Sequence, residues 1–163
     1  MRRLATECVD LVRPELASSS ALKALALLGY GQSYPQSLRL IDQLTSMSGI
    51  EFEQWVANLF RAAGWDTEQT PVTGDHGIDL IVHKRGATSV VQCKRWLDPV
   101  GEAVVRDMYG ALMSFGARHG FVIAPTSFTE QACKFAAGKP ISLIEIEELI
   151  AWSKQPDSFN PEG

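Results

Sequence analysis

The chain has 163 residues, of which 45% are hydrophobic and 21% charged, enough for one full domain with a packed core. Its formal net charge of −4 excludes a generally basic nucleic-acid coat, and no apolar run approaches the roughly 18–20 residues that cross a bilayer. The first three residues are basic enough for a secretory signal, but Glu7 and Asp10 interrupt the apolar stretch that such a signal needs. Three widely spaced cysteines fit no disulfide or metal framework, so a cytoplasmic protein without a membrane partner is expected.

Charge is unevenly divided along the chain. Residues 1–48 carry five basic and four acidic side chains, a net of +1, and the remaining residues carry ten and fifteen, a net of −5. A nucleic acid would therefore have to meet a local basic patch, with metal neutralising clustered carboxylates.

Residues 1–46 are expected to form a helical N-terminal extension. Residues 21–28 are rich in Ala and Leu, and Gly29 stops the pattern. After Pro35, the residues Leu38, Ile41 and Leu44 recur at helical spacing. These pieces are too short for an independent core.

Residues 47–154 are expected to form the main domain. Ser48 and Glu51 fit a capping box at the start of a helix, and an apolar stripe continues until Gly64 ends it. Glu53 falls at the edge of that stripe, near the core boundary. Residues 155–163 read as a flexible tail.

The rest of the domain alternates between strands and helices. The sequence predicts strands at 65–70, 78–83, 88–95, 120–124 and 141–144, and helices at about 101–115, from Ser127 to about 137, and at 145–154. Ser127 and Glu130 read as a second capping box, and Gly110 predicts close packing of a helix on the sheet. This order predicts an α/β fold with a mixed sheet flanked by helices.

Strand periodicity brings together the side chains that could do chemistry. Alternation puts Ile78, Leu80 and Val82 on one face of their strand and Asp79 on the other. Gln92 and Lys94 share a face of the next strand. If the two strands pair around the turn at 84–87, Asp79 comes close to Gln92 and Lys94, and Glu53 could approach the same cluster.

Such a cluster suits metal-assisted hydrolysis of phosphodiesters. Oxygen ligands hold Mg²⁺, which lowers the pKa of bound water, and the lysine can orient that water or stabilise developing charge. The competing interpretation is a structural polar cluster at the sheet edge with a simple ion pair.

Asp79 followed by Gln92-Cys93-Lys94 resembles the Asp…(Glu/Gln)-x-Lys signature of the restriction-endonuclease-like fold, also written PD-(D/E)xK. The wider series resembles the Mrr-type restriction endonuclease domain over about residues 47–152. It consists of Gly49-Ile-Glu-Phe-Glu53, Gly64-Trp65, Gly74-Asp-His-Gly-Ile-Asp-Leu80, Val91-Gln-Cys-Lys-Arg95, Val100-Gly101, and Phe128-Thr129 before Ala132 and Ala136.

The resemblance implies a site and a reaction. Asp79, Gln92, Glu53 and the backbone carbonyl of Cys93 would hold Mg²⁺, with Mn²⁺ as a possible substitute, and Lys94 would be the catalytic lysine. Together with Asp79, Gln92 and Glu53, that lysine makes up the expected catalytic set. The implied function is a Mg²⁺-dependent DNA endonuclease that restricts foreign or modified DNA.

Further expectations concern DNA and assembly. Arg95 is the best candidate for a phosphate contact, and His76, Lys84 and Arg85 are further candidates. A homodimer is expected because cutting both strands usually requires two active sites. Two alternatives stay open: a catalytically silent DNA-binding or assembly module, and a structure-specific repair or junction nuclease.

Overall fold

The computed structural model describes residues 36–70, 77–96 and 98–156. The chain divides into two units, Met1–Asp42 and Gln43–Gly163, and the second contains the sheet. The expected helix at 21–28 and most of the expected tail lie outside the described residues. The predicted bounds of the extension and the tail therefore stay predictions.

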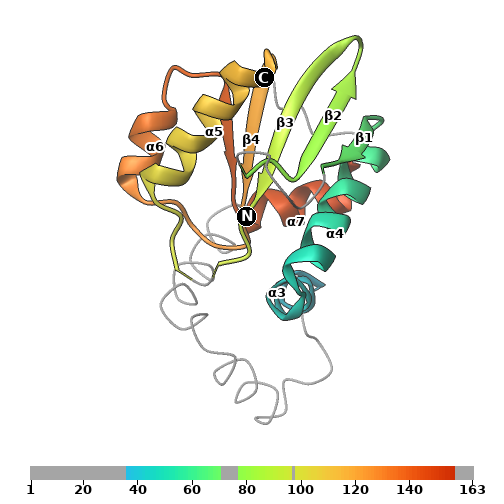
Figure 1. The fold of residues 1–163 in the computed structure, drawn as a ribbon. Coiled ribbons are helices and arrows are strands. Elements are labelled where there is room, and N and C mark those ends of the chain that lie inside the picture. The colour runs from blue at the N-terminus through green and yellow to red at the C-terminus, as the bar shows by residue number, and fades with distance from the viewer. Residues whose placement is uncertain (1–35, 71–76, 97, 157–163) are drawn as a thin grey trace, which may run out of the picture. The chain divides into compact units, whose positions relative to one another are not determined.

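Five strands of the described residues form one sheet in the order β1-β2-β3-β4-β5. The β1–β2 and β2–β3 pairs are antiparallel, whereas the β3–β4 and β4–β5 pairs are parallel (Figure 1). The predicted mixed sheet is thus confirmed. The strands are β1 (Asp66–Gln69), β2 (Leu80–Lys84), β3 (Ala87–Cys93), β4 (His119–Ile123) and β5 (Ile141–Ile144).

Helices cover both faces of this sheet. Figure 1 shows α5 and α6 on one side and α4 and α7 on the other, which is the arrangement of a layered α/β domain. The helices are α3 (Gln36–Ser46), α4 (Gly49–Ala62), α5 (Glu102–Phe115), α6 (Glu130–Ala136) and α7 (Ile146–Lys154).

Aromatic packing holds α4 and α7 against the sheet. The Phe60 ring of α4 makes edge contacts with Trp152 of α7 at 4.8 Å, Trp65 at 5.6 Å and Phe121 of β4 at 5.5 Å between centroids. Rings meeting edge to face add to the stabilisation from burial. The capping box at the start of α4 is present: Ser48 accepts from the Glu51 N–H, and the Glu51 carboxylate accepts from the Ser48 N–H.

The opposite face carries α5, and here one expectation was wrong. A Cβ added at Gly110 would meet no atom within 4 Å, so Gly110 is not a close-packing position. The close approach of helix and sheet occurs instead at Gly120 of β4, where an added Cβ would lie 2.8 Å from Met108 Sδ and 3.2 Å from Leu112 Cδ1. Glycine is favoured at this position of the strand because Met108 and Leu112 fill the space above it.

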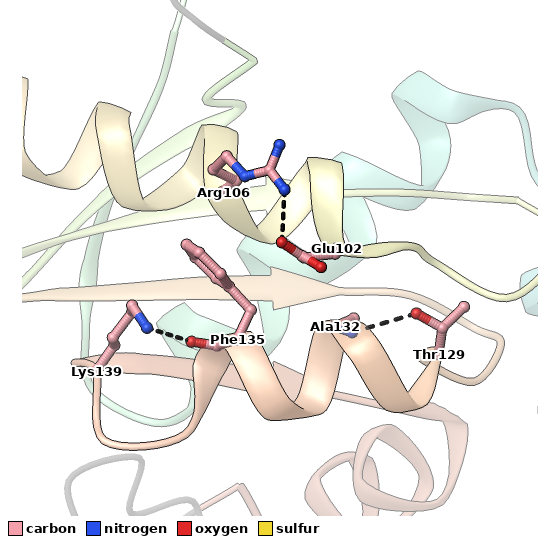
Figure 2. Close-up of polar contacts among 6 residues, drawn as sticks. All are labelled: Glu102, Arg106, Thr129, Ala132, Phe135 and Lys139. Carbon is pink, nitrogen blue, oxygen red and sulfur yellow. Dashed lines mark hydrogen bonds and ion pairs between the residues drawn. The ribbon is translucent and has the colours of Figure 1, made fainter.

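The N-terminus of α6 also differs from the expected one. The cap is Thr129, whose hydroxyl accepts a 3.2 Å hydrogen bond from the Ala132 N–H (Figure 2). Ser127 cannot cap the helix because the segment from 127 to 129 is held extended against Val100. The Val100 N–H donates to the Ser127 carbonyl, and the Thr129 N–H donates to the Val100 carbonyl. The helix therefore starts two residues later than the sequence pattern suggests.

Candidate active site

The candidate site lies where the parallel strands β3, β4 and β5 reach their carboxyl ends. Open α/β sheets commonly bind ligands at such an edge. β2 runs antiparallel to β3, so the residue that precedes β2 reaches the same edge. That residue is Asp79.

Two hydrogen bonds fix Asp79 against β3. Its backbone N–H donates to the Val91 carbonyl at 2.9 Å, and its Oδ2 accepts from the Cys93 N–H at 2.6 Å. The carboxylate thus satisfies a backbone donor at the point where β3 passes the end of β2. The structure places Asp79 beside residues 91–93, as pairing of the two strands around the turn at 84–87 predicts.

Strand alternation does not hold one residue earlier, at Ile78. This residue is buried with Val90 and Val122 in the cluster beneath α5, and Ile81 packs against the same cluster. Alternation would put residues 78 and 81 on opposite faces. The rule does not extend to Ile78 because β2 begins only at Leu80.

Gln92 is buried at the same edge, with 4% of its surface exposed. Its Oε1 has no hydrogen-bond partner among the described residues. On its other side, an added Cβ at Gly77 would lie 2.3 Å from Gln92 Nε2, and Gly77 also has a positive φ of 79°. A buried polar atom without a partner is costly, so Gln92 Oε1 marks a position for a donor or a cation.

Lys94 lies two residues later and is half-buried. Its backbone N–H donates to the Ile123 carbonyl at 2.8 Å, which extends the β3–β4 ladder past Cys93. Its Nζ lies 5.6 Å from the centroid of the Trp96 ring, within reach of a cation–π contact. Trp96, which is 47% exposed, thus flanks the ammonium group.

A pocket of about 570 Å³ opens between this edge and α5. Gly77, Gln92 and Lys94 form part of its wall. The opposite wall was not predicted from the sequence, and α5 supplies it through Arg106, Asp107, Gly110 and Ser114. Asp107, Gly110 and Ser114 recur at helical spacing as a face without large apolar residues, a signal that the sequence did contain.

Electrostatics connects Glu53 of α4 to the cluster. Burial raises the pKa of Glu53, the charge of Asp79 raises it further, and Lys94 lowers it. Burial also raises the pKa of Asp79, against the opposing effects of the Cys93 N–H and of Lys94. The two acids and the lysine are therefore close enough to influence one another.

The surroundings of the Cys93 thiol disfavour a role as a nucleophile. Burial, followed by the negative charges of Asp79 and Glu53, raises its pKa well above the ordinary value. A thiol in such surroundings stays protonated and unreactive. The cysteine contributes backbone groups to this edge.

The donor set fits a hard cation. Asp79 and Glu53 offer carboxylates, and Gln92 offers an orphaned amide oxygen, all of which are oxygen ligands that Mg²⁺ accepts. Across the described ranges, no group of three or more His, Cys, Asp and Glu side chains could hold a metal. The fit therefore depends on the amide of Gln92 in addition to the two acids.

The residues predicted to contact DNA are spread over the domain. Arg95 Nη1 donates to the Thr45 carbonyl at 3.2 Å. Lys84 Nζ donates to the Ala63 carbonyl at 2.7 Å, and its turn neighbour Arg85 has a positive φ of 51°. Both turn residues lie at the end of the β2–β3 hairpin away from Asp79. His76 lies outside the described residues.

Residues 44–153 match the family model Mrr_cat, described as restriction endonuclease. The chain belongs to this family. The match covers the whole sheet and its flanking helices, and it makes this part of the chain a restriction-endonuclease-like nuclease domain. No curated protein matches the chain.

Solved structures share the fold of this restriction endonuclease domain. The DNA modification-dependent restriction endonuclease AspBHI aligns with a TM-score of 0.61 and 16% identity, over 78% of this chain and 37% of that one. The MspJI restriction endonuclease, solved in complex with a 27-mer oligonucleotide, aligns with a TM-score of 0.56 and 18% identity, over 73% and 31%. A repair endonuclease from Pyrococcus abyssi aligns with a TM-score of 0.50 and 21% identity, over 61% and 47%.

The similarity to these structures concerns the domain and not the whole of each protein. The chain covers 65% of AF1548, a protein of unknown function, and smaller shares of the three endonucleases. At these identities the likeness shows the fold. Within the described helices, none has both the length and the apolar character that a membrane span requires.

Proposed function

We propose that the protein is a Mg²⁺-dependent endonuclease that hydrolyses phosphodiester bonds in DNA and restricts foreign or modified DNA. The observation that carries the proposal is the buried Gln92 Oε1, which lacks a partner among the described residues and belongs to a side chain that lines the same pocket as Lys94.

Asp79, Glu53, Gln92 Oε1 and the backbone carbonyl of Cys93 would hold the metal. Magnesium, when bound, supplies charge neutralisation at the phosphate and activation of water. Mn²⁺ offers similar chemistry with the same oxygen ligands. Gln92 is neutral, so we expect this site to hold metal less strongly than an all-carboxylate one.

Lys94 has the position to act on the substrate. Lys94 lines the pocket, and its ammonium group can pair with a phosphate oxygen or with the attacking water. Trp96 beside it limits the directions that the flexible side chain can take. In this proposal a metal-activated water attacks the phosphate directly, so no covalent intermediate with the protein forms.

The two acids hold the charge that a cation would neutralise. Their raised pKa values mean that each carboxylate is less stable in its ionised form than a solvated one. A divalent cation held by the two acids would offset that penalty.

DNA recognition in this proposal depends on a local surface. Arg95, Lys84, Arg85 and His76 remain candidates for phosphate contacts, and the net charge of −4 gives no general attraction to DNA. A homodimer would provide the two active sites needed to cut both strands. If sedimentation showed that a monomer cleaves both strands, this result would count against the proposed homodimer.

A nicking assay tests the function. Purified protein is incubated with supercoiled plasmid in Mg²⁺, Mn²⁺ or EDTA, alongside linear, methylated, branched and single-stranded DNA. The proposal predicts metal-dependent nicking of plasmid, with methylated and unmethylated DNA differing. Metal-insensitive DNA binding without any nicking would favour a silent module, and cleavage confined to branched DNA would favour a structure-specific nuclease.

A further inference from the structure

Gly110 lies in the interior of α5, where glycine is a poorer helix former than alanine. Two structural reasons commonly explain a helical glycine. One is close packing, which is absent because an added Cβ would meet nothing within 4 Å. The other is a positive φ, and Gly110 has none. The fold itself therefore does not require glycine at this position.

The pocket gives Gly110 a different setting. Gly110 lines it, and Gln92 and Lys94 line the facing wall. Gln92 is 4% exposed, and its Oε1 has no partner among the described residues, so a side chain with an unsatisfied acceptor lines the pocket. Its volume of about 570 Å³ falls within the range of ligand pockets, about 300–1,000 Å³.

The charges around Gly110 favour one orientation of a nucleic-acid strand. Lys94 and Arg106 are the pocket's cations, and Arg106 is held by an ion pair with Glu102 on its own helix (Figure 2). Asp107 repels phosphate, but its carboxylate can accept hydrogen bonds from sugar and base edges, and the Ser114 hydroxyl can accept or donate them. Phosphate would thus face Lys94, and the sugar and base would face the helix.

We infer that Gly110 is a substrate-contact position, kept without a side chain so that the DNA strand can lie against α5 while its phosphate reaches Lys94. The inference rests on the proposed function and names the surface that receives the strand. Gly77 differs in kind, because there an added Cβ would collide with Gln92 itself. At Gly110 an added side chain would instead occupy space that the DNA strand needs.

The test uses substitutions that should not harm the fold. Gly110→Ala, Gly110→Leu and Gly110→Gln all introduce better helix formers into open space, so each melting temperature should rise, by about 2–4 °C. The matched control is Ala103→Leu, which adds similar bulk at an exposed position of the same helix outside the pocket. Affinity for a fluorescein-labelled DNA duplex is measured in EDTA by anisotropy, and plasmid nicking is measured in Mg²⁺.

We expect Gly110→Leu and Gly110→Gln to weaken duplex binding about tenfold and to reduce nicking about 100-fold, as misplacement of a reacting group does. Ala103→Leu should bind and nick as the wild type does. Wild-type binding and nicking in both bulky variants would overturn the inference while the proposed function stands. A wild type that binds duplex in a Gly110-dependent way but nicks no DNA would overturn the function alone, and one that neither binds nor nicks DNA would overturn both.

Discussion

The Asp79 carboxylate accepts a hydrogen bond of 2.6 Å from the backbone N–H of Cys93. This bond makes Asp79 both a structural acceptor at the end of β3 and the proposed metal ligand. The two roles can be separated, because an amide oxygen can accept the bond but cannot supply the negative charge.

Asp79→Ala is predicted to lower both stability and activity, whereas Asp79→Asn lowers activity alone. Alanine leaves the Cys93 N–H without an acceptor, a cost of about 1–3 kcal/mol in the free energy of unfolding. Asparagine keeps an acceptor. Urea denaturation and plasmid nicking measure the two effects, and equal stability of the two variants would show that the bond contributes little.

Lys94→Ala is predicted to reduce the nicking rate by about 100- to 1,000-fold with the fold intact, because one preorganised charge is lost from the pocket. Lys134→Ala is the control, since Lys134 is an exposed residue of α6 that pairs with Glu130 one turn away. Rates are compared under saturating Mg²⁺. Undiminished nicking by Lys94→Ala would exclude a catalytic role for the lysine.

Gln92→Glu is predicted to destabilise the metal-free protein and to strengthen metal binding. An ionised carboxylate at a position that is 4% exposed costs about 3 kcal/mol without a cation, and the cation offsets that cost. The thermal shift on adding Mg²⁺ should therefore exceed that of the wild type. Gln69→Glu on exposed β1 is the control, and an unchanged Mg²⁺ shift in Gln92→Glu would argue against a metal at this residue.

Glu53→Gln is predicted to stabilise the fold near neutral pH. The raised pKa of Glu53 means that the folded protein holds the proton more tightly than the unfolded chain, so wild-type stability falls as pH rises through that pKa. Glutamine removes this dependence. The difference in the free energy of unfolding between variant and wild type should shrink as the pH falls below the ordinary glutamate pKa. Urea denaturation at a series of pH values measures this difference. If the stability difference between Glu53→Gln and wild type instead grew as the pH fell, the pKa of Glu53 could not be raised in the folded protein.

Gly120→Ala is predicted to destabilise the protein by about 1 kcal/mol, because its methyl group would crowd Met108 and Leu112. This sign is opposite to that predicted for Gly110→Ala. Thermal melts of the two variants compare the positions directly, and a stabilised Gly120→Ala would show that Met108 moves aside at no cost.

Local signals in the sequence predicted much of the fold. The Ser48–Glu51 capping box and the five strands can be read from residue order alone, because each depends on neighbours within a few positions. The proximity of Asp79 to residues 92–94 was predictable as well, since a short turn fixes the pairing of β2 with β3.

The incorrect predictions concern positions whose local structure depends on residues that are distant in the sequence. Ser127 does not cap α6 because Val100, far away in the sequence, holds that segment extended. Gly110 looked like a packing residue because the sequence does not show which glycine faces the sheet. The helical spacing of Asp107, Gly110 and Ser114 marks a face of α5, but the sequence does not show that this face lines the pocket with Gln92 and Lys94.

The initial rate of plasmid nicking across a Mg²⁺ titration, with wild type and Asp79→Asn side by side, tests the central claim most directly. We predict a wild-type rate that rises from zero in EDTA to saturation, and no metal-dependent rate in Asp79→Asn of unchanged thermal stability. Equal Mg²⁺-dependent rates in the two proteins would contradict the account.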